Sequence, residues 1–411
     1  MKILFFTFAI LFVHNFAHAQ THQQYLYQSG TIDSIYSETL HEYRTIYIQL
    51  PDSYNPDKKE KYPVAYILDG EVFLPTLGIV QDYYSGGFTP EMILIGISNS
   101  KHRTRDLTPS EIKTKYGMPF NEENGQAANF YKFLSKELIP YIEDHYPVTN
   151  YRTLIGHSYG GLFTIYTLIH HPPLFANYLA IDPSLDWDDQ KLLKQTGNVL
   201  KKDNFKGKSL YMSLSGQLHM QNLDITIDNV MQDTTSFTLF ARSNIAFSNL
   251  IKNHKECGLS FEWEFFPNDL HGTIPFPSIR SGLIALFSWF QMEKTDELNS
   301  PDTPKDELYQ LIKFRENKLK NHFGYFIPPY PEDLMNMMGY MTMDMGQSEK
   351  AKMFFELSIE YFPQSPNAFD SMADYYASQK DYSSALKYVT KAYELSQNDY
   401  YKERIEKFKE K

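Results

Sequence analysis

The stretch GHSYGG at residues 156–161 decides how the chain is interpreted, because it fits the pattern G-x-S-x-G. A short apolar segment, 153–155, precedes it, and a helix-compatible run, 162–169, follows it. A strand that turns sharply into a helix holds the serine in a strained turn, with its hydroxyl exposed and the next backbone N–H aimed at a developing oxyanion. The pattern therefore predicts Ser158 as a nucleophile and the N–H of Tyr159 as an oxyanion donor. A tight turn with an idle serine is the alternative.

Short apolar runs alternate with segments of helical periodicity from residue 43 to residue 292. Strands that are buried on both faces of a sheet are expected to be continuous apolar runs. A half-buried strand is expected to alternate apolar and polar residues with a period of two. The strand candidates are 43–50, 64–68, 92–97, 153–155, 178–181, 210–214 and 261–266, and the clearest helix candidates are 126–145, 240–254 and 278–292. Strand and helix alternate throughout, which predicts an α/β class with a mostly parallel sheet flanked by helices.

A length of 411 residues is enough for two or three domains. The sequence pattern changes near residue 295, beyond which no strand candidate occurs. The segment 295–306 is polar with two prolines and is predicted to be a linker. Beyond it, the segment 335–363 is repeated at an offset of 34 residues, so that Ala351 and Phe355 align with Ala385 and Val389. This is the tetratricopeptide period, and it predicts an all-α repeat domain over 307–411. Helices at 306–323 and 400–409 would pack against and cap the repeats.

Residues 1–19 have the pattern of a secretory signal, with Lys2, an apolar stretch at 3–13 and an A-x-A site that predicts cleavage after Ala19. No later segment reaches the roughly 20 apolar residues of a membrane span. The single cysteine, Cys257, excludes an intrachain disulfide. The formal charge of −11 argues against nucleic acid as a partner. We therefore expect a periplasmic or secreted protein whose α/β domain spans 20–294.

A serine nucleophile needs a base, and in this fold the partners follow in the order serine, acid, histidine. His271 lies in the loop directly after the last strand candidate and is predicted to be that base. The acid is not fixed by the sequence: Asp233, just before a helix, is our choice, with an N-cap role as its alternative. The other candidates are Asp224, Asp228 and Asp269, and a dyad without an acid also remains open.

The second oxyanion donor should come from the loop after the strand at 64–68. Gly70 and Glu71 lie there, and glycine allows the backbone to approach a substrate closely. The sequence has no metal-binding or phosphate-binding motif, so neither a metal nor a cofactor is expected.

Several further motifs give the segment 30–293 a resemblance to the putative-esterase family of α/β-hydrolases, which includes esterase D and the ferric-enterobactin esterases. Besides the GHSYGG stretch these are the Leu-Asp-Gly end of 63–70, RTRDLTP at 103–109, DPSL at 182–185 and DLHGT at 269–273. The resemblance implies ester hydrolysis through Ser158 and His271. It also suggests that Arg103 or Arg105 borders the substrate, with an Arg–Asp salt bridge within that loop as the alternative.

Two departures from the family pattern concern the same site. After DPSL the family often carries paired aromatic residues, whereas this chain has Asp186 followed by Trp187, which leaves Trp187 as the predicted pocket wall. The acid loop also lacks its usual form. The expected function is an exported serine esterase acting on a small-molecule or glycan ester, with the helical repeats either packing beside the active-site mouth or recruiting a protein partner. The rivals are an acyltransferase on the same fold and an inactive hydrolase-like domain in a repeat-mediated binding protein.

Overall fold

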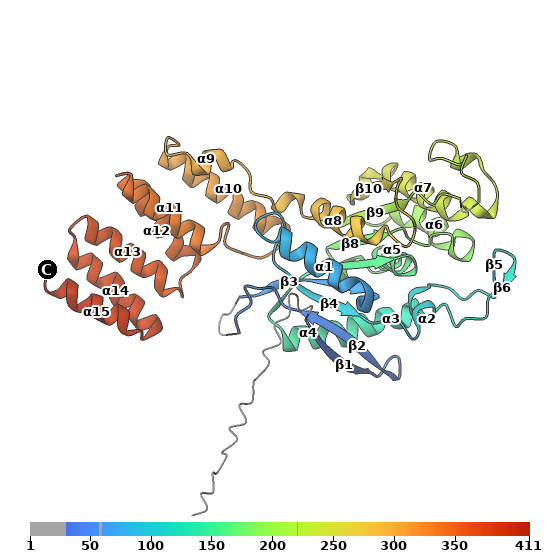
Figure 1. Ribbon diagram of the computed structural model, residues 1–411, viewed down its shortest axis with the longest axis horizontal. Coiled ribbons are helices and arrows are strands. Elements are labelled where there is room, and N and C mark those ends of the chain that lie inside the picture. The colour runs from blue at the N-terminus through green and yellow to red at the C-terminus, as the bar shows by residue number, and fades with distance from the viewer. Residues whose placement is uncertain (1–29, 57–59, 220) are drawn as a thin grey trace, which may run out of the picture.

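The computed structural model describes residues 30–56, 60–219 and 221–411. The predicted signal peptide, 1–19, lies outside the described residues. Within them, no helix is both long enough and apolar enough to cross a lipid bilayer. Figure 1 shows two lobes, an α/β lobe built on a twisted sheet and a lobe made of paired helices that ends with the C-terminus.

An eight-stranded sheet forms the centre of the α/β lobe, in the order β1-β2-β4-β3-β7-β8-β9-β10. Its strands are β1 (Thr31–Ser37), β2 (Glu42–Gln49), β3 (Tyr62–Leu68), β4 (Ile93–Ile97), β7 (Val148–His157), β8 (Asn177–Ile181), β9 (Ser209–Ser215) and β10 (Ser260–Phe266). Strand β2 is antiparallel to both its neighbours, and the other pairs are parallel. The prediction of a mostly parallel α/β sheet is therefore confirmed.

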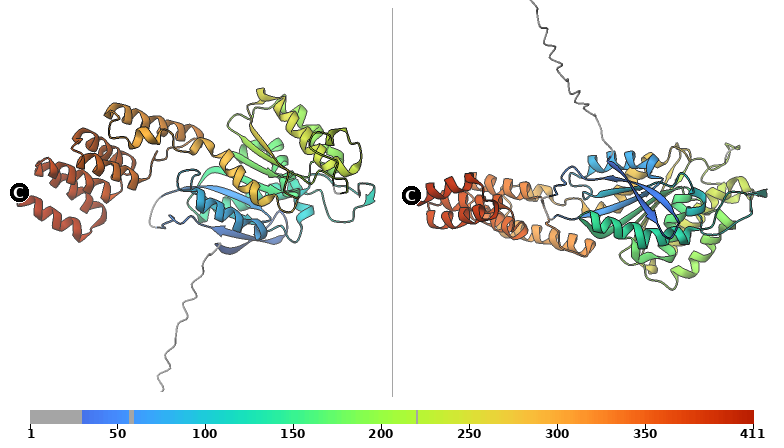
Figure 2. Two further views of the ribbon diagram at one scale, coloured as in Figure 1. Left: turned by 45° about the horizontal axis from the view of Figure 1, so that its top comes forward. Right: turned by 90° about the horizontal axis from the view of Figure 1, so that it is seen from below.

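Helices cover both faces of the sheet, as the two views in Figure 2 show. One face carries α1 (Gly70–Tyr84) and α8 (Pro275–Leu286), and the other carries α3 (Ala127–Phe133), α4 (Ile139–His145), α5 (Tyr159–His170), α6 (Trp187–Leu200) and α7 (Leu239–Lys252). Successive residues of a strand point to opposite faces. In β3, Tyr66 and Leu68 accordingly join the core under α3–α7, while Ala65 and Ile67 join the core under α1 and α8. This double burial explains the continuous apolar runs in the sequence.

Some elements differ from the sequence-based expectation. Strand β1 was not expected, because its outer residues are polar or exposed at the edge of the sheet. The hairpin β5 (Thr114–Lys115) and β6 (Met118–Pro119) has strands too short to show a period. Helix α8 ends at Leu286 rather than 292, and the predicted linker contains the short helix α9 (Thr295–Asn299).

The second lobe begins with α10 (Lys305–Phe323) and continues as α11 (Glu332–Asp344), α12 (Ser348–Tyr361), α13 (Pro366–Ser378), α14 (Tyr382–Ser396) and α15 (Asp399–Lys409). The two predicted repeats correspond to the hairpins α11–α12 and α13–α14. The small residues that align at the 34-residue offset, Ala351 and Ala385, are both fully buried. Helices α10 and α15 take the flanking positions expected of a packing helix and a cap.

Helix α10 joins the two lobes, because its last turn packs into the core beneath α1 and α8. Leu319 and Phe323 belong to that core. The Phe323 ring lies edge-on to Tyr151 of β7, with 4.9 Å between ring centroids, and 5.1 Å from Trp289. The domain limits at 294 and 307 stay predictions, since this helix packs against both lobes.

Replacing Phe323 with alanine should lower the free energy of unfolding by about 3 kcal/mol, because the ring is 5% exposed and its removal leaves a cavity at the junction. Phe314 lies on the same helix but is 58% exposed, so Phe314→Ala should change that free energy by less than about 0.5 kcal/mol. Urea unfolding followed by circular dichroism measures both. Equal effects of the two substitutions would contradict the packing described here.

Candidate active site

Ser158 occupies the turn between β7 and α5, as the sequence predicts. Its backbone has φ 59° and ψ −115°, a left-handed conformation that is costly for a residue with a side chain. The turn is held by the next strand, since the N–H of Ser158 donates to the carbonyl of Ile181 at 3.0 Å. Gly156 is required by sterics, because a Cβ there would lie 2.2 Å from the carbonyl oxygen of Gly160. Strand and helix therefore approach too closely for any larger residue.

His271 follows β10 and reaches the serine. Its Nε2 lies 3.0 Å from Oγ of Ser158, and its Nδ1 lies 2.7 Å from Oδ2 of Asp182. A carboxylate accepts hydrogen bonds and cannot donate one, so the proton sits on Nδ1 and Nε2 is free to accept from the serine hydroxyl. The backbone N–H of His271 donates to Oε1 of Gln217 at 3.1 Å, which fixes the loop. The three side chains have the geometry of a nucleophile, a base and an orienting acid.

Asp182 is the first residue after β8, the strand next to β7, and it is fully buried. Its Oδ1 accepts from the N–H of Ser215 at 3.0 Å, while its own N–H donates to the carbonyl of Ser213 at 3.1 Å. The carboxylate is therefore fixed by β9 on one side and by His271 on the other. The sequence carried a signal for this residue, since an aspartate directly after a strand that neighbours the nucleophile strand must lie at the same edge of the sheet.

The predicted acid, Asp233, is wrong as the partner of His271. Its Oδ1 accepts from the N–H and hydroxyl of Thr235 and from the hydroxyl of Thr238. These bonds are local to the loop, and the N-cap alternative does not hold either, because Thr238 is the N-cap residue of α7. The other candidates are not the partner of His271 either: Asp224 and Asp228 are exposed, and Asp269 accepts from the hydroxyl of Thr273. The choice of Asp233 failed because the acid was sought after β9, whereas the residue that contacts His271 follows β8.

Three backbone N–H groups lie at helix starts near the serine. Tyr159 is the first residue of α5, and Gly70 and Glu71 are the first two residues of α1. The first N–H groups of a helix have no partner within that helix and can bind an anion. Asp69, which precedes them, has φ 52° and is buried, and a Cβ on Gly70 would lie 2.4 Å from Cα of Gly96. The predicted oxyanion donors thus begin two helices that follow the neighbouring parallel strands β3 and β7.

The two arginines predicted to border the substrate are engaged in ion pairs. Arg105 donates to Glu42 and to Asp106, both at 2.7 Å, and its side chain is 10% exposed, so its guanidinium is engaged by carboxylates of the protein and a contact with substrate stays a prediction. Arg103 forms a bidentate pair with Asp69, and its side chain is 32% exposed. The alternative of an Arg–Asp salt bridge within this loop describes Arg105, which pairs with Asp106, whereas Arg103 pairs with Asp69 outside the loop.

Trp187, predicted as a pocket wall, is 2% exposed and donates from Nε1 to the carbonyl of Ser110 at 2.9 Å. Little of its side chain is therefore open to a ligand, and its role as a pocket wall stays a prediction. Its ring lies edge-on to Tyr159, 5.2 Å between centroids. Lys115 of the β5–β6 hairpin also lies beside these rings. Its Nζ is 3.0 Å from the hydroxyl of Tyr159 and 4.0 Å from Oδ2 of Asp186. Sequence reasoning missed this hairpin and its lysine, because strands of two residues show no period.

His157, which precedes the nucleophile, is also buried. Its Nε2 lies 2.8 Å from the carbonyl oxygen of His271, and since a carbonyl only accepts, Nε2 donates. Its ring packs edge-on against Phe73, 5.6 Å between centroids. Burial lowers the pKa of His157 to about 4, with the neighbouring imidazole of His271 acting in the same direction. His157 is therefore neutral at neutral pH and holds the loop of the base.

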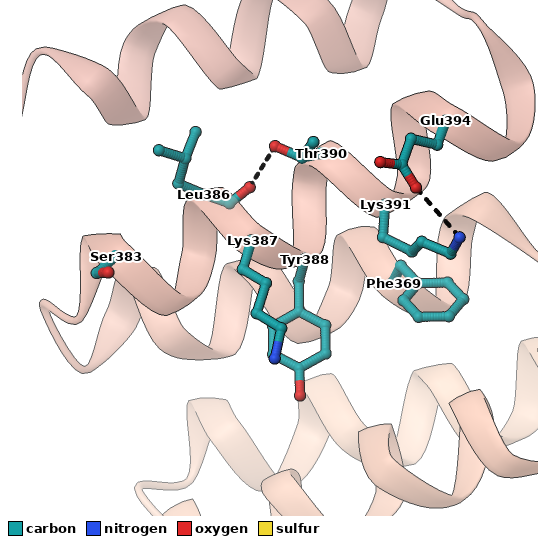
Figure 3. A pocket seen from close by; sticks show the side chains of 8 residues that line it. All are labelled: Phe369, Ser383, Leu386, Lys387, Tyr388, Thr390, Lys391 and Glu394. Carbon is teal, nitrogen blue, oxygen red and sulfur yellow. Dashed lines mark hydrogen bonds and ion pairs between the residues drawn. The ribbon is translucent and has the colours of Figure 1, made fainter.

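In the part of the chain that the structure describes, no group of three or more His, Cys, Asp or Glu side chains is arranged to hold a metal ion. A hollow of about 580 Å³ lies elsewhere, on the helical repeats (Figure 3). Seven of its eight lining residues come from α14 and Phe369 comes from α13, and two of the seven, Lys391 and Glu394, pair with each other. None of its lining residues belongs to the serine site.

An α/β-hydrolase fold with a serine, a histidine and an aspartate in contact defines the class of this protein. The chain belongs to the family described as Putative esterase, whose model matches residues 37–246. The description Tetratricopeptide repeat matches residues 332–365, the first of the two predicted repeats. The resemblance inferred from the sequence is confirmed for both parts.

One curated relative is the Ferri-bacillibactin esterase BesA of Bacillus subtilis, 30% identical over 183 residues. The match covers 40% of this chain and 63% of BesA, so it spans a little under two thirds of the relative. An IroE-like serine hydrolase from Shewanella oneidensis is 25% identical, with a TM-score of 0.64 over 80% of this chain and 99% of that one. An uncharacterised Capnocytophaga ochracea protein, 20% identical, shares the fold, with a TM-score of 0.59 over 93% of this chain and 99% of that one.

Replacing Asp182 with asparagine should lower kcat for an ester substrate by about 10³- to 10⁴-fold, because the amide favours the wrong tautomer of His271. The kcat of the matched variant Asp233→Asn should stay within about twofold of the wild-type value. The carboxylate of Asp233 accepts its hydrogen bonds from Thr235 and Thr238 and does not contact His271. Steady-state hydrolysis of p-nitrophenyl acetate compares the two. A larger loss in Asp233→Asn would restore the sequence-based choice.

The buried His157 should make the protein less stable in acid. Between about pH 4 and its ordinary pKa of about 6.5, the unfolded chain binds a proton at this position that the folded chain does not. Its contribution to the free energy of unfolding is therefore complete above pH 6.5 and falls as the pH is lowered to 4, by about 3 kcal/mol in total. Unfolding by urea at pH 4.5 and 7.5 should show a smaller pH effect in His157→Gln. Parallel pH profiles of the two proteins would contradict the shift.

Proposed function

We propose that the chain is an exported serine hydrolase of carboxylic esters, acting through an acyl-enzyme on Ser158. The observation that carries the proposal is the continuous contact from Ser158 through His271 to Asp182, with distances of 3.0 and 2.7 Å. A serine in a strained strand-to-helix turn, a base with a free Nε2 and two helix N-termini at one edge of a sheet are the parts that acyl transfer needs.

The chemistry proceeds in two halves. His271 takes the proton of the Ser158 hydroxyl as Oγ attacks the ester carbonyl, and the N–H groups of Tyr159 and of Gly70 or Glu71 receive the oxyanion. The protonated His271 then gives its proton to the leaving alcohol, and an acyl-enzyme remains. Water, deprotonated by the same base, attacks the acyl carbon and releases the acid and Ser158. Asp182 stabilises the imidazolium in both halves without being protonated.

The substrate proposed is a small-molecule ester of the siderophore class. The name of the Bacillus subtilis relative, a ferri-bacillibactin esterase, supports this class, as does the IroE-like serine hydrolase of similar structure. A glycan ester is the alternative from the sequence. The signal pattern at 1–19 supports action outside the cytoplasm, and the tetratricopeptide region supports a protein partner for the helical lobe.

A fluorophosphonate probe should label the purified mature chain, and the label should disappear in Ser158→Ala together with hydrolysis of p-nitrophenyl acetate. Ser184→Ala is the matched control, because the Ser184 hydroxyl lies 3.3 Å from Oγ of Ser158 and is buried beside it. That variant should keep the label. Labelling that persists in Ser158→Ala, or a wild type that neither labels nor hydrolyses, would overturn the proposal.

A substrate panel extends this experiment to the class of ester. Ferric and iron-free catecholate siderophore lactones, acetylated sugars and simple aryl esters would be compared by kcat/KM, with products separated by chromatography. The siderophore proposal requires the lactones to exceed the sugar esters by at least about tenfold, and the reverse order would select the glycan alternative. Added alcohols that become acylated in place of hydrolysis would select an acyltransferase.

A further inference from the structure

The proposed oxyanion donors come from two segments that are distant in the sequence. Gly70 and Glu71 follow β3, whereas Tyr159 follows β7. Stabilisation of an oxyanion depends on the spacing of its donors, because each must lie about 2.7 to 3.1 Å from one developing charge. Some contact must therefore hold the two segments in register. Arg103, the first residue of α2 (Arg103–Leu107), lies between them.

One side of the Arg103 guanidinium holds the segment before α1. Its Nε donates to Oδ1 of Asp69 and its Nη2 to Oδ2, both at 2.9 Å, which is the planar fork that only arginine offers. Asp69 is 4% exposed and has φ 52°, and its carbonyl accepts the N–H groups of Val72 and Phe73. Those bonds leave Gly70 and Glu71 as the N–H groups at the helix start without a partner in their helix.

The same guanidinium also holds the nucleophile turn. Its Nη2 donates to the carbonyl of His157 at 3.0 Å, and its central carbon lies 5.5 Å from the centroid of the Tyr159 ring. One planar group thus contacts the residue before the nucleophile, the residue after it and the residue before the other donors. Arg105, two residues further on, pairs instead with Glu42 and Asp106.

We propose that Arg103 is a positioning residue that sets the distance between the two halves of the oxyanion hole. The inference rests on the proposed function and adds a determinant of kcat to it. The substrate would not contact the Asp69-bound edge of the guanidinium, so Arg103 would contribute to the transition state through the placement of backbone N–H groups. A displacement of a reacting group by about 1 Å can cost a factor of about 10² in rate.

Arg103→Lys tests this role, because lysine keeps the charge and loses the fork. With p-nitrophenyl acetate we expect kcat to fall about 10- to 100-fold while KM stays within about twofold. The rate of fluorophosphonate labelling should fall with kcat. Arg280→Lys, on the exposed face of α8, is the matched control and should keep both rates. Thermal melting of each variant confirms that it is folded.

Chemical rescue separates positioning from a general loss of structure. Arg103→Ala should be reactivated at least about fivefold by methylguanidinium and not by methylammonium at the same concentration, because the 32%-exposed site is open to a small cation and only the planar one restores both donors to Asp69. In an Asp69→Asn background, Arg103→Lys should cost much less than in the wild type, since the two residues act as one unit.

An unchanged kcat in folded Arg103→Lys would overturn the inference. So would a higher KM at constant kcat, which would make Arg103 a substrate contact. If Arg103→Ala does not fold, the lysine variant decides the question by itself. A wild type without Ser158-dependent labelling would instead overturn the proposed function, and this role with it, so the two failures are distinguishable.

Discussion

The hydrogen bond from Ser158 N–H to the carbonyl of Ile181 is the constraint on which the site depends, because it holds the residue that follows β7 in a positive-φ turn that side chains disfavour. A strained backbone persists only where the surrounding structure fixes it from several directions. Here β8 supplies both the acceptor, Ile181, and the next residue, Asp182, which orients His271. One strand end thus holds the nucleophile and the acid together.

The parallel strands place the remaining site residues at the same edge of the sheet. Because β3, β7, β8, β9 and β10 are parallel, their carboxyl ends meet at one edge. The oxyanion segment follows β3, the nucleophile follows β7, the acid follows β8 and the base follows β10. All four segments therefore belong to the α/β lobe. The helical lobe is attached to it through α10, whose last turn packs into the core beneath α1 and α8.

The sequence alone was sufficient for those parts of the fold whose signal is local. Continuous apolar runs identified the central strands, a glycine pattern identified the elbow of Ser158, and a fixed offset identified the helical repeats. Asp182 was quoted as part of a motif but not recognised as the acid, because its role depends on which strands are neighbours. Strand order is a long-range property that periodicity does not carry. The pair between Arg105 and Glu42 of β2 escaped prediction for the same reason, whereas the hairpin with Lys115 escaped because its strands are too short to show a period.

Ion pairs between segments that are distant in the sequence hold the loops around the site. Arg103 is balanced by Asp69, Arg105 by Glu42 and Asp106, and Lys115 lies beside Asp186. A buried or half-buried cation is costly unless it is paired, so each pair stabilises only one arrangement of its loops. The cations that motif matching assigned to the substrate are thus used to shape the loops around Ser158. Under the proposed function, the placement of the oxyanion donors would then depend on these loops and their ion pairs, and not on a direct contact between a cation and the substrate.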